Sequence, residues 1–439
     1  MRIIGILQGC NPIRSWINRS AFAAILFMAP TMVWVSAHAE DLSSRIVAPI
    51  PEALPELRYV RTLPAPNEAD GLGMYQSGTS RLTWSADGER LAAYVRYGLE
   101  IITWSPDGKY QFQIPRNARF GLDAYVLGFL SGHSQIITSP SAATIDLDEE
   151  EKVEQMAFSV MDAMTGRLIR GVPGPNPGKT FRENIAKHQA ISPDQQLVAV
   201  IHHPYAGPSV EVYSARDWQR IAVIATGADK GYDGAQALAF SPDGRKLAIA
   251  QGHSNRLDIF EVGSWKLLRS IEPFPETPPP MHVLSLSAIA FSPDGSMIAV
   301  GSFSGGTYWR NPDGRPAPNG VGTPVQMFPP DPLRVFRVDD GSLVASATGF
   351  PGGFWDENTI AWMPNGRFIA FLDVERQLRL WGLTQRGPPV LAAKLERSAG
   401  WLAFSPDGGQ LAINFAKGVK IFDVVDPNQK SNQDDRSPR

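Results

Sequence analysis

Cysteine is almost absent from this chain: among 439 residues only Cys10 carries a thiol. We expect Cys10 to belong to an N-terminal segment that is removed, so the mature chain would have none. Without cysteine, disulfides, thiolate metal sites and cysteine nucleophiles are all excluded. The mature chain must then be stabilised by its own hydrophobic core. About 400 residues, with 43% hydrophobic residues in the full chain, are sufficient to form one.

Long hydrophobic runs are also scarce, and one lies near the N-terminus. Residues 21–35 form an apolar stretch that follows Arg14 and Arg19 and precedes Ala37-His38-Ala39. A basic region, a short apolar core and small residues at a cleavage site are typical of a secretory signal. The run is shorter than the roughly 20 residues of a membrane span. We therefore expect cleavage after Ala39 and a periplasmic or secreted protein, with an uncleaved N-terminal membrane anchor as the alternative.

The chain has no excess of positive charge. Its formal net charge is −3, and residues 1–39 contain three arginines and no acidic residue, so the mature chain would carry −6. A negatively charged chain gives no electrostatic reason to expect nucleic acid as the partner. The sequence also shows no second membrane-spanning segment.

The most informative feature that is present is a recurring four-residue phrase between two apolar segments. Complete Ser-Pro-Asp-Gly copies stand at 241–244, 292–295 and 405–408, and altered copies at 85–88, 192–195 and 363–366. Asp bonds to its own nearby backbone and Gly tolerates positive φ, so the phrase predicts a tight turn between two strands. We therefore interpret Asp243, Asp294 and Asp407 as turn residues rather than metal ligands.

Each repeat continues with a third strand that ends in an aromatic residue and a fourth strand such as 265–268. Four antiparallel strands over roughly 45 residues are typical of one propeller blade. First turns near residues 85, 131, 192, 241, 292, 363 and 405 predict seven blades. A further copy at 105–108 follows the first too closely to start a new blade, and we expect it to join strands three and four of blade one.

The two ends of the repeat region predict how the ring closes. The last blade reaches its third strand at 419–424, while residues 57–63 form an unassigned strand that is similar to a fourth strand. We expect this N-terminal strand to complete blade seven, because closure removes exposed sheet edges. The predicted organisation is an all-β chain with a signal peptide, a Pro-rich linker, a seven-bladed propeller and a disordered polar tail, over residues 1–39, 40–55, 56–425 and 426–439.

These repeats resemble the WD40 family and its bacterial relatives with the same turn, the TolB-type (PD40) propellers. The Ser-Pro-Asp-Gly turns and the aromatic ends of the third strands carry the resemblance over nearly all of the mature chain. The family's Trp-Asp position reads Phe260-Glu261, Trp381-Gly382 and Phe422-Asp423, and the Gly-His-Ser triplets at 132–134 and 252–254 lie elsewhere in the repeat. The resemblance therefore implies the fold but not the family's His-Ser-Asp-Trp hydrogen-bond network. It also implies a non-enzymatic scaffold.

The loops predict which face of such a ring is elaborated. Loops between strands one and two, and three and four, share one face and are short here. Loops between strands two and three, and between blades, share the other face and are long. The long ones are 140–153, 172–189, 202–208, 226–236, 272–286, 304–332 and 349–358. Because binding residues usually lie on loops held by a rigid scaffold, we predict a binding site on the long-loop face.

Aromatic and arginine residues mark a candidate contact area within that face. The largest insertion and the connection to blade six contain the candidates Tyr308, Trp309, Arg310, Arg315, Phe328, Phe350, Phe354 and Trp355. These residue types are the usual anchors of protein contacts. The alternative is a small core that stabilises the loop itself. The acidic run 149–151 is interpreted as a solvated loop.

The leading hypothesis is therefore a monomeric, non-enzymatic propeller that binds a protein or peptide, without cofactor or metal. The alternative is a propeller enzyme, either a lactonase-like hydrolase or a quinone-dependent dehydrogenase subunit, with its site at the mouth of the central channel. Polar side chains converging at that mouth would favour the enzyme. The histidines available are His133, His188, His202, His203, His253 and His282. None has helical metal-ligand spacing, and no Gly-x-Ser-x-Gly motif occurs.

Overall fold

The structure is a computed structural model, and every regular element among its described residues is a β-strand. The chain divides into the units Met1–Ile50 and Pro51–Arg439, and all described residues belong to the second. These residues are 53–64, 81–95, 100–109, 111–115, 127–131, 134–139, 156–175, 186–202, 209–226, 235–251, 254–275, 284–304, 307–310, 316–317, 323–326, 332–348, 359–373, 375–384, 388–396, 399–415 and 418–427. No helix in these ranges has the length and apolar character needed to span a membrane.

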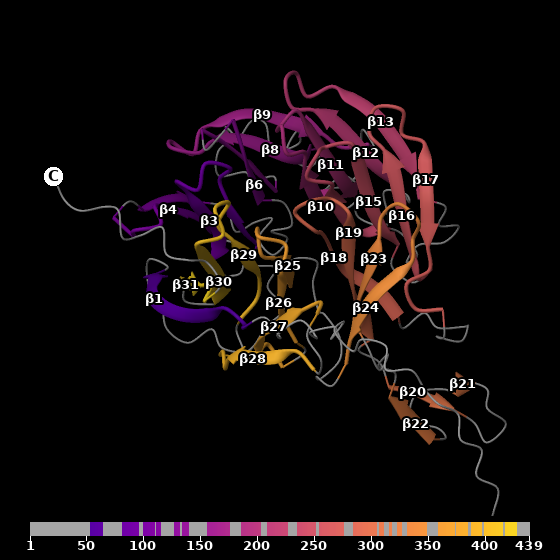
Figure 1. Cartoon of the computed structure of the whole chain (residues 1–439). Coiled ribbons are helices and arrows are strands. Elements are labelled where there is room, and N and C mark those ends of the chain that lie inside the picture. The colour runs from indigo at the N-terminus through magenta and orange to yellow at the C-terminus, as the bar shows by residue number, and fades with distance from the viewer. Residues whose placement is uncertain are drawn as a thin grey trace, which may run out of the picture. The chain divides into compact units, whose positions relative to one another are not determined.

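The described strands form a seven-bladed propeller of four-stranded antiparallel sheets, as predicted (Figure 1). Blade one has β2 (Leu82–Trp84), β3 (Leu91–Val95), β4 (Glu100–Trp104) and β5 (Gln111–Pro115). Blade two has β6 (Leu127–Leu130), β7 (Gln135–Thr138), β8 (Met156–Asp162) and β9 (Leu168–Pro173). Blade three has β10 (Ala186–Ile191), β11 (Leu197–His202), β12 (Ser209–Ser214) and β13 (Arg220–Ala225).

The remaining blades repeat the same order of strands. Blade four has β14 (Ala235–Phe240), β15 (Lys246–Gln251), β16 (Arg256–Glu261) and β17 (Leu267–Ile271). Blade five has β18 (Leu284–Phe291), β19 (Met297–Ser304), β23 (Leu333–Arg337) and β24 (Leu343–Ala347). Blade six has β25 (Ile360–Trp362), β26 (Phe368–Leu372), β27 (Leu378–Gly382) and β28 (Val390–Ala393). Blade seven has β29 (Leu402–Phe404), β30 (Gln410–Phe415), β31 (Gly418–Val425) and β1 (Glu56–Pro64).

Blade seven closes the ring, and the predicted closing strand is confirmed. The N-terminal strand β1 pairs antiparallel with the C-terminal strand β31, from Glu56 opposite Val425 to Pro64 opposite Gly418. Figure 1 shows this as the indigo β1 beside the yellow β31. The Ser-Pro-Asp-Gly copy at 105–108 lies between β4 and β5, also as predicted.

The core lies between neighbouring blades. The first strands of most neighbouring blades contact one another, as β14 and β18 do, so the first strands form the inner wall of the ring and the fourth strands its outer edge. One buried cluster, for example, joins Ile259 and Ile271 of blade four to Ile298 and Phe336 of blade five. Large and small apolar residues alternate along these strands, which lets the two sheet faces interdigitate.

The recurring phrase has a specific structural role in each turn. In the turn at 292–295, Asp294 Oδ1 accepts hydrogen bonds from Ser292 Oγ at 2.5 Å and from the Ser296 N–H at 3.0 Å. Ser292 Oγ in turn accepts the Met297 N–H at 2.9 Å. The same bonds recur at Asp194, Asp243 and Asp407. Asp243, Asp294 and Asp407 thus act in the structure as turn residues.

Proline and glycine of the phrase connect one turn to the next. A Cβ added to the glycine of one turn would lie between 3.2 and 3.8 Å from the proline of the preceding blade's turn. The pairs are Gly88 with Pro406, Gly244 with Pro193, Gly295 with Pro242, Gly366 with Pro293, and Gly408 with Pro364. The short-loop face is therefore a closely packed series of turns.

One detail of the prediction is wrong. The sequence predicts Trp265 within the fourth strand of blade four, but β17 begins at Leu267 and Trp265 lies in the preceding turn with φ +56°. Its N–H donates to the Glu261 carbonyl at 2.8 Å, which closes the turn. A turn of this kind requires one residue with positive φ, and this requirement overrides the β preference of tryptophan.

Candidate functional site

The predicted insertion in blade five forms its own small sheet. Strands β20 (Thr307–Arg310), β21 (Pro316–Ala317) and β22 (Thr323–Gln326) follow β19 and precede β23, in the spatial order β21-β20-β22. Among the described residues this sheet pairs with no strand of a blade. The insertion therefore leaves blade five between its second and third strands, on the long-loop face.

Three of the predicted contact residues lie on the central strand of this sheet. Tyr308, Trp309 and Arg310 are on β20, with Trp309 opposite both Ala317 of β21 and Pro324 of β22. The other candidates, Arg315, Phe328, Phe350, Phe354 and Trp355, lie outside the described residues. Their grouping into one contact area stays a prediction.

Of the histidines, His202 belongs to a buried polar network in blade three. Its Nε2 lies 3.0 Å from Glu211 Oε2, which also accepts the Tyr213 hydroxyl at 2.5 Å, while Arg220 Nη1 donates to Glu211 Oε1 at 2.5 Å. Burial raises the pKa of Glu211, but these hydrogen bonds and the charge of His202 outweigh it and lower the pKa to about 2. Burial and the neighbouring carboxylate raise the pKa of Tyr213.

This network explains why a buried carboxylate is tolerated in blade three, and His202 is one of the side chains that form it. His133, His203, His253 and His282 lie outside the described residues. Within the described part of the chain, no group of three or more His, Cys, Asp or Glu side chains is arranged to hold a metal ion.

At the inner wall of the ring, Arg81 connects three blades. Arg81 precedes β2, and its Nη2 donates to the Lys187 carbonyl of β10 at 2.8 Å and lies 3.1 Å from His188 Nδ1. Its guanidinium also lies 4.7 Å from the ring centre of Trp401, next to β29. These contacts connect blades one, three and seven and occupy the guanidinium. They indicate a structural link across the ring rather than a ligand site.

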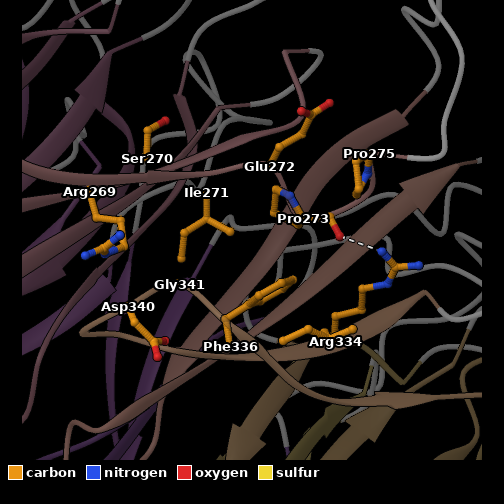
Figure 2. Close-up of a pocket in the computed structure, with 11 residues that line it drawn as sticks. Arg269, Ser270, Ile271, Glu272, Pro273, Pro275, Arg334, Phe336, Asp340 and Gly341 are labelled. Carbon is orange, nitrogen blue, oxygen red and sulfur yellow. Dashed lines mark hydrogen bonds between the residues drawn. The ribbon is translucent and has the colours of Figure 1, made fainter.

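A groove between blades four and five is the candidate binding site on the outer edge of the ring (Figure 2). It has a volume of about 330 Å³ and is lined on one side by residues 269–273 and Pro275. Arg334, Phe336, Gly341 and Leu343 are among the residues that line the other side. Ile271 and Phe336 are 7% and 5% exposed and form an apolar floor, while Leu343 is 52% exposed at the rim.

The wall formed by the segment after β17 is held in place by two side chains. Arg334 Nη1 donates to the Pro273 carbonyl at 2.8 Å, the dashed bond in Figure 2, and its guanidinium lies 4.7 Å from the ring centre of Phe274. Asn255 binds both backbone groups of Phe274, with Nδ2 donating to the carbonyl at 2.8 Å and Oδ1 accepting the N–H at 3.2 Å. The groove is therefore preorganised, which lowers the entropy lost on binding.

The charges around the groove balance. Arg269 and Arg334 contribute two positive charges, and Glu272 and Asp340 two negative ones. Arg269 Nη2 donates to the Asp339 carbonyl at 2.6 Å. Hydrogen bonds from Ser342, followed by the charges of Arg337 and Arg269, keep the pKa of Asp340 below its usual value. A groove without net charge favours a neutral, apolar ligand over an anion or a cation.

Comparison with known proteins supports a relationship to WD repeats. Residues 279–307, which include all of β18 and β19, match the family model described as WD domain, G-beta repeat. Over 73 residues the chain is 33% identical to the WD repeat-containing protein VIP3 of Arabidopsis thaliana. This alignment covers 16% of the chain and 23% of that protein. Both matches agree with the resemblance to the WD40 family, and neither is to a TolB-type propeller.

Sequence reasoning missed the groove and the Arg81 link. Both depend on residues of different blades that meet only in the folded ring, such as Arg269 with Gly341, or Arg81 with His188. The sequence did contain one usable signal for the groove. The turn residue before the fourth strand is tryptophan in blades three and four but glycine in blade five.

Proposed function

We propose that this chain is an exported, non-enzymatic propeller that binds a protein or peptide through its long-loop face. The single observation that carries the proposal is the contrast between the two faces of the ring. One face consists of short turns packed proline against glycine, whereas blade five extends a separate three-stranded sheet from the other. A rigid ring with one elaborated face is the usual arrangement of a binding scaffold.

The residues on the insertion support this assignment. Tyr308, Trp309 and Arg310 are adjacent on β20, and tyrosine, tryptophan and arginine are the residue types most enriched at binding hot spots. The similarity to WD repeats supports the same class of function, since WD40 propellers commonly serve as interaction scaffolds. Fold alone does not fix function, so the insertion and not the fold locates the proposed site.

Export is the second part of the proposal, and the apolar run at 21–35 supports it. Expression of the full chain in a bacterial host, followed by fractionation and N-terminal sequencing, tests it directly. We expect a mature protein in the periplasm or medium that begins at Glu40. A protein that keeps Met1 and sediments with membranes would instead support an N-terminal anchor.

The binding function is tested by cross-linking capture from the native envelope fraction. The mature chain is compared with a variant in which residues 305–331 are replaced by a short Gly-Ser link. Because β19 and β23 pair directly with one another, we expect the variant to keep its propeller and to lose the partner. A chain shortened by residues 428–439 serves as the control and should retain the partner.

Capture of the same partners by the Gly-Ser variant, with an unchanged circular dichroism spectrum, would show that the insertion is not the binding site. If neither chain captures a partner, the scaffold proposal fails. Hydrolase and dehydrogenase assays, together with metal analysis, would then test the enzyme alternative.

A further inference from the structure

Among the turns that the structure describes between third and fourth strands, four share the same form. In each, a backbone N–H donates to the carbonyl four residues earlier: Gly166 to Asp162, Trp218 to Ser214, Trp265 to Glu261, and Gly341 to Arg337, at 2.8–3.0 Å. The four donors all have positive φ, between +56° and +74°. They are therefore structurally equivalent positions, and their side chains can be compared directly.

In blades three and four the residue at this position is a tryptophan that packs against the preceding blade. The Trp218 and Phe158 rings meet edge to face with centres 5.7 Å apart, and Phe158 lies on β8 of blade two. Trp265 packs against the cluster that joins blades three and four, as does Ala222 of β13. Each indole therefore fills the outer groove between its own blade and the blade before it.

Blade five breaks this pattern, because Gly341 takes the place of the tryptophan. Arg269 pairs with Ile259, and the equivalent residue is Ala222 in blade three but Arg170 in blade two, whose groove holds Trp218. A Cβ at Gly341 would lie 3.1 Å from Arg269 Cδ and 3.3 Å from Ile271 Cγ1. The groove of about 330 Å³ described above lies where the indole of the neighbouring grooves would be. In blade two the position belongs to Gly166, next to β5, whose side chains lie outside the described residues.

We propose that the groove between blades four and five binds an aromatic side chain, tryptophan foremost, of an extended partner peptide. The inference rests on the proposed binding function and adds a second contact surface to it. Two equivalent grooves are filled by indoles of this chain itself. In the groove between blades four and five, the aromatic ring would come from the partner peptide.

The chemistry of the groove agrees with an aromatic ligand. Ile271 and Phe336 provide an apolar floor, and in Figure 2 the side chain of Ile271 extends toward Phe336 and Gly341. The planar guanidinium of Arg269, with one donor on the Asp339 carbonyl, is positioned for an aromatic ring to stack on it. The balanced charges give no reason for a strongly charged ligand.

The surroundings agree with a ligand that is a peptide rather than a free small molecule. The groove runs along β17, which is the edge strand of blade four, and an edge strand presents backbone N–H and C=O groups to an added strand. Leu343 lines the groove at its rim and is 52% exposed. It provides an apolar contact for a residue that flanks the aromatic anchor.

The probe for the test is N-acetyl-L-tryptophanamide, with N-acetyl-L-alaninamide as the matched negative probe. Methyl NMR spectra of the mature chain labelled at isoleucine and leucine report on Ile271 and Leu343. We expect saturable shifts of these two residues with the tryptophan probe and none with the alanine probe. Shifts confined to other methyl groups, or none at all, would overturn the inference.

A variant that fills the groove provides the second arm. Arg269→Ala combined with Gly341→Trp recreates the pair of Ala222 and Trp265, and the alanine removes the nearest side chain that a Cβ at 341 would contact. We expect this variant to bind the probe at least about tenfold more weakly. Leu391→Ser, a change at a 40% exposed residue of β28 outside the groove, should bind it as the wild type does.

A second variant keeps the test informative if the filled groove misfolds. Leu343→Arg replaces an apolar residue at the rim of the groove and leaves the core unchanged. It should also weaken binding of the probe. If either folded groove variant binds the probe like the wild type, the groove assignment is wrong. Two results together would reject only this inference and leave the proposed function intact. In the first, partner capture requires residues 305–331 but is unchanged in both groove variants. In the second, the probe causes no shifts.

Discussion

Glu211 shows how a single buried carboxylate can be stabilised in a blade. It is 1% exposed, and it has hydrogen-bonding contacts with His202, Tyr213 and Arg220. Removing one member of a buried charged network is costly, because the remaining groups keep their desolvation cost without their partner. The equivalent position in blade four is Asp258, which accepts from Gln251 and Arg256, and in blade six it is Arg379, which donates to Asp373.

We predict that Glu211→Gln lowers the free energy of unfolding by about 2 to 3 kcal/mol, because the amide cannot accept all of these bonds and carries no charge. Urea denaturation monitored by tryptophan fluorescence measures the change. Glu261→Gln is the control, since Glu261 is exposed and its carboxylate accepts only from Ser264 among the bonds the structure describes, and it should change stability by less than about 0.5 kcal/mol. Equal effects of the two substitutions would show that the network contributes nothing specific.

Among the elements, strand β1 closes the ring by pairing with the strand at the opposite, C-terminal end of the propeller. Leu63 lies opposite Val419, 356 residues later in the chain, and the two strands pair along their length with one irregularity between Tyr59 and Arg61. Leu63 is 1% exposed and belongs to the cluster that joins blades one and seven with Trp104 and Trp401. This strand therefore both completes a blade and contributes to the interface that closes the ring.

We expect Leu63→Ala to destabilise the propeller by about 3 kcal/mol, because it removes a buried side chain and leaves a cavity at the closure. Chemical denaturation gives the free energy, and size-exclusion chromatography shows whether the opened edge causes association. Arg58→Ala on the same strand is the control, since its ion pair with Glu56 is solvent-exposed. A loss at Leu63 no larger than that at Arg58 would contradict a closing role for β1.

Elements also show where sequence reasoning reached its limit. The Ser-Pro-Asp-Gly copies and the aromatic ends of the third strands were sufficient to predict the blades, because turn chemistry and strand alternation are local properties. The repeat pattern predicts a fourth strand that includes Trp265, whereas in the structure Trp265 closes the preceding turn with positive φ. The insertion in blade five was predictable from the sequence, whereas the groove between blades four and five was not, because contacts between blades are set by the tertiary structure.

At the scale of the whole molecule, the repeated turns make stability depend on pH. Hydrogen bonds from the turn serines, followed by those from the backbone, lower the pKa of Asp194, Asp243, Asp294 and Asp407. A carboxyl whose pKa is lower in the folded state stabilises the fold above its unfolded pKa of about 3.9, and this stabilisation is lost as the pH falls further. Because the same turn recurs around the ring, the contributions act together.

We therefore predict a nearly constant free energy of unfolding between about pH 5 and 8 and a progressive loss below about pH 4. The triple variant Asp243→Asn, Asp294→Asn, Asp407→Asn should be less stable than the wild type at pH 7, and the difference should shrink toward pH 3. Asn365 already occupies this position in blade six and accepts the Arg367 N–H at 3.0 Å, so the variant should fold. Denaturation at a series of pH values measures both curves, and a constant difference would contradict the prediction.

The sequence by itself determined the number of blades, their strand order and the closure by the N-terminal strand, because each follows from a repeated local pattern of turns and alternating strands. Only the tertiary structure decided which side chains of neighbouring blades meet. Glycine at 341, where blades three and four have tryptophan, is visible in the sequence as a single residue. It leaves a groove only because the ring places β17 beside the turn of blade five, and contacts between blades depend on packing rather than on local pattern.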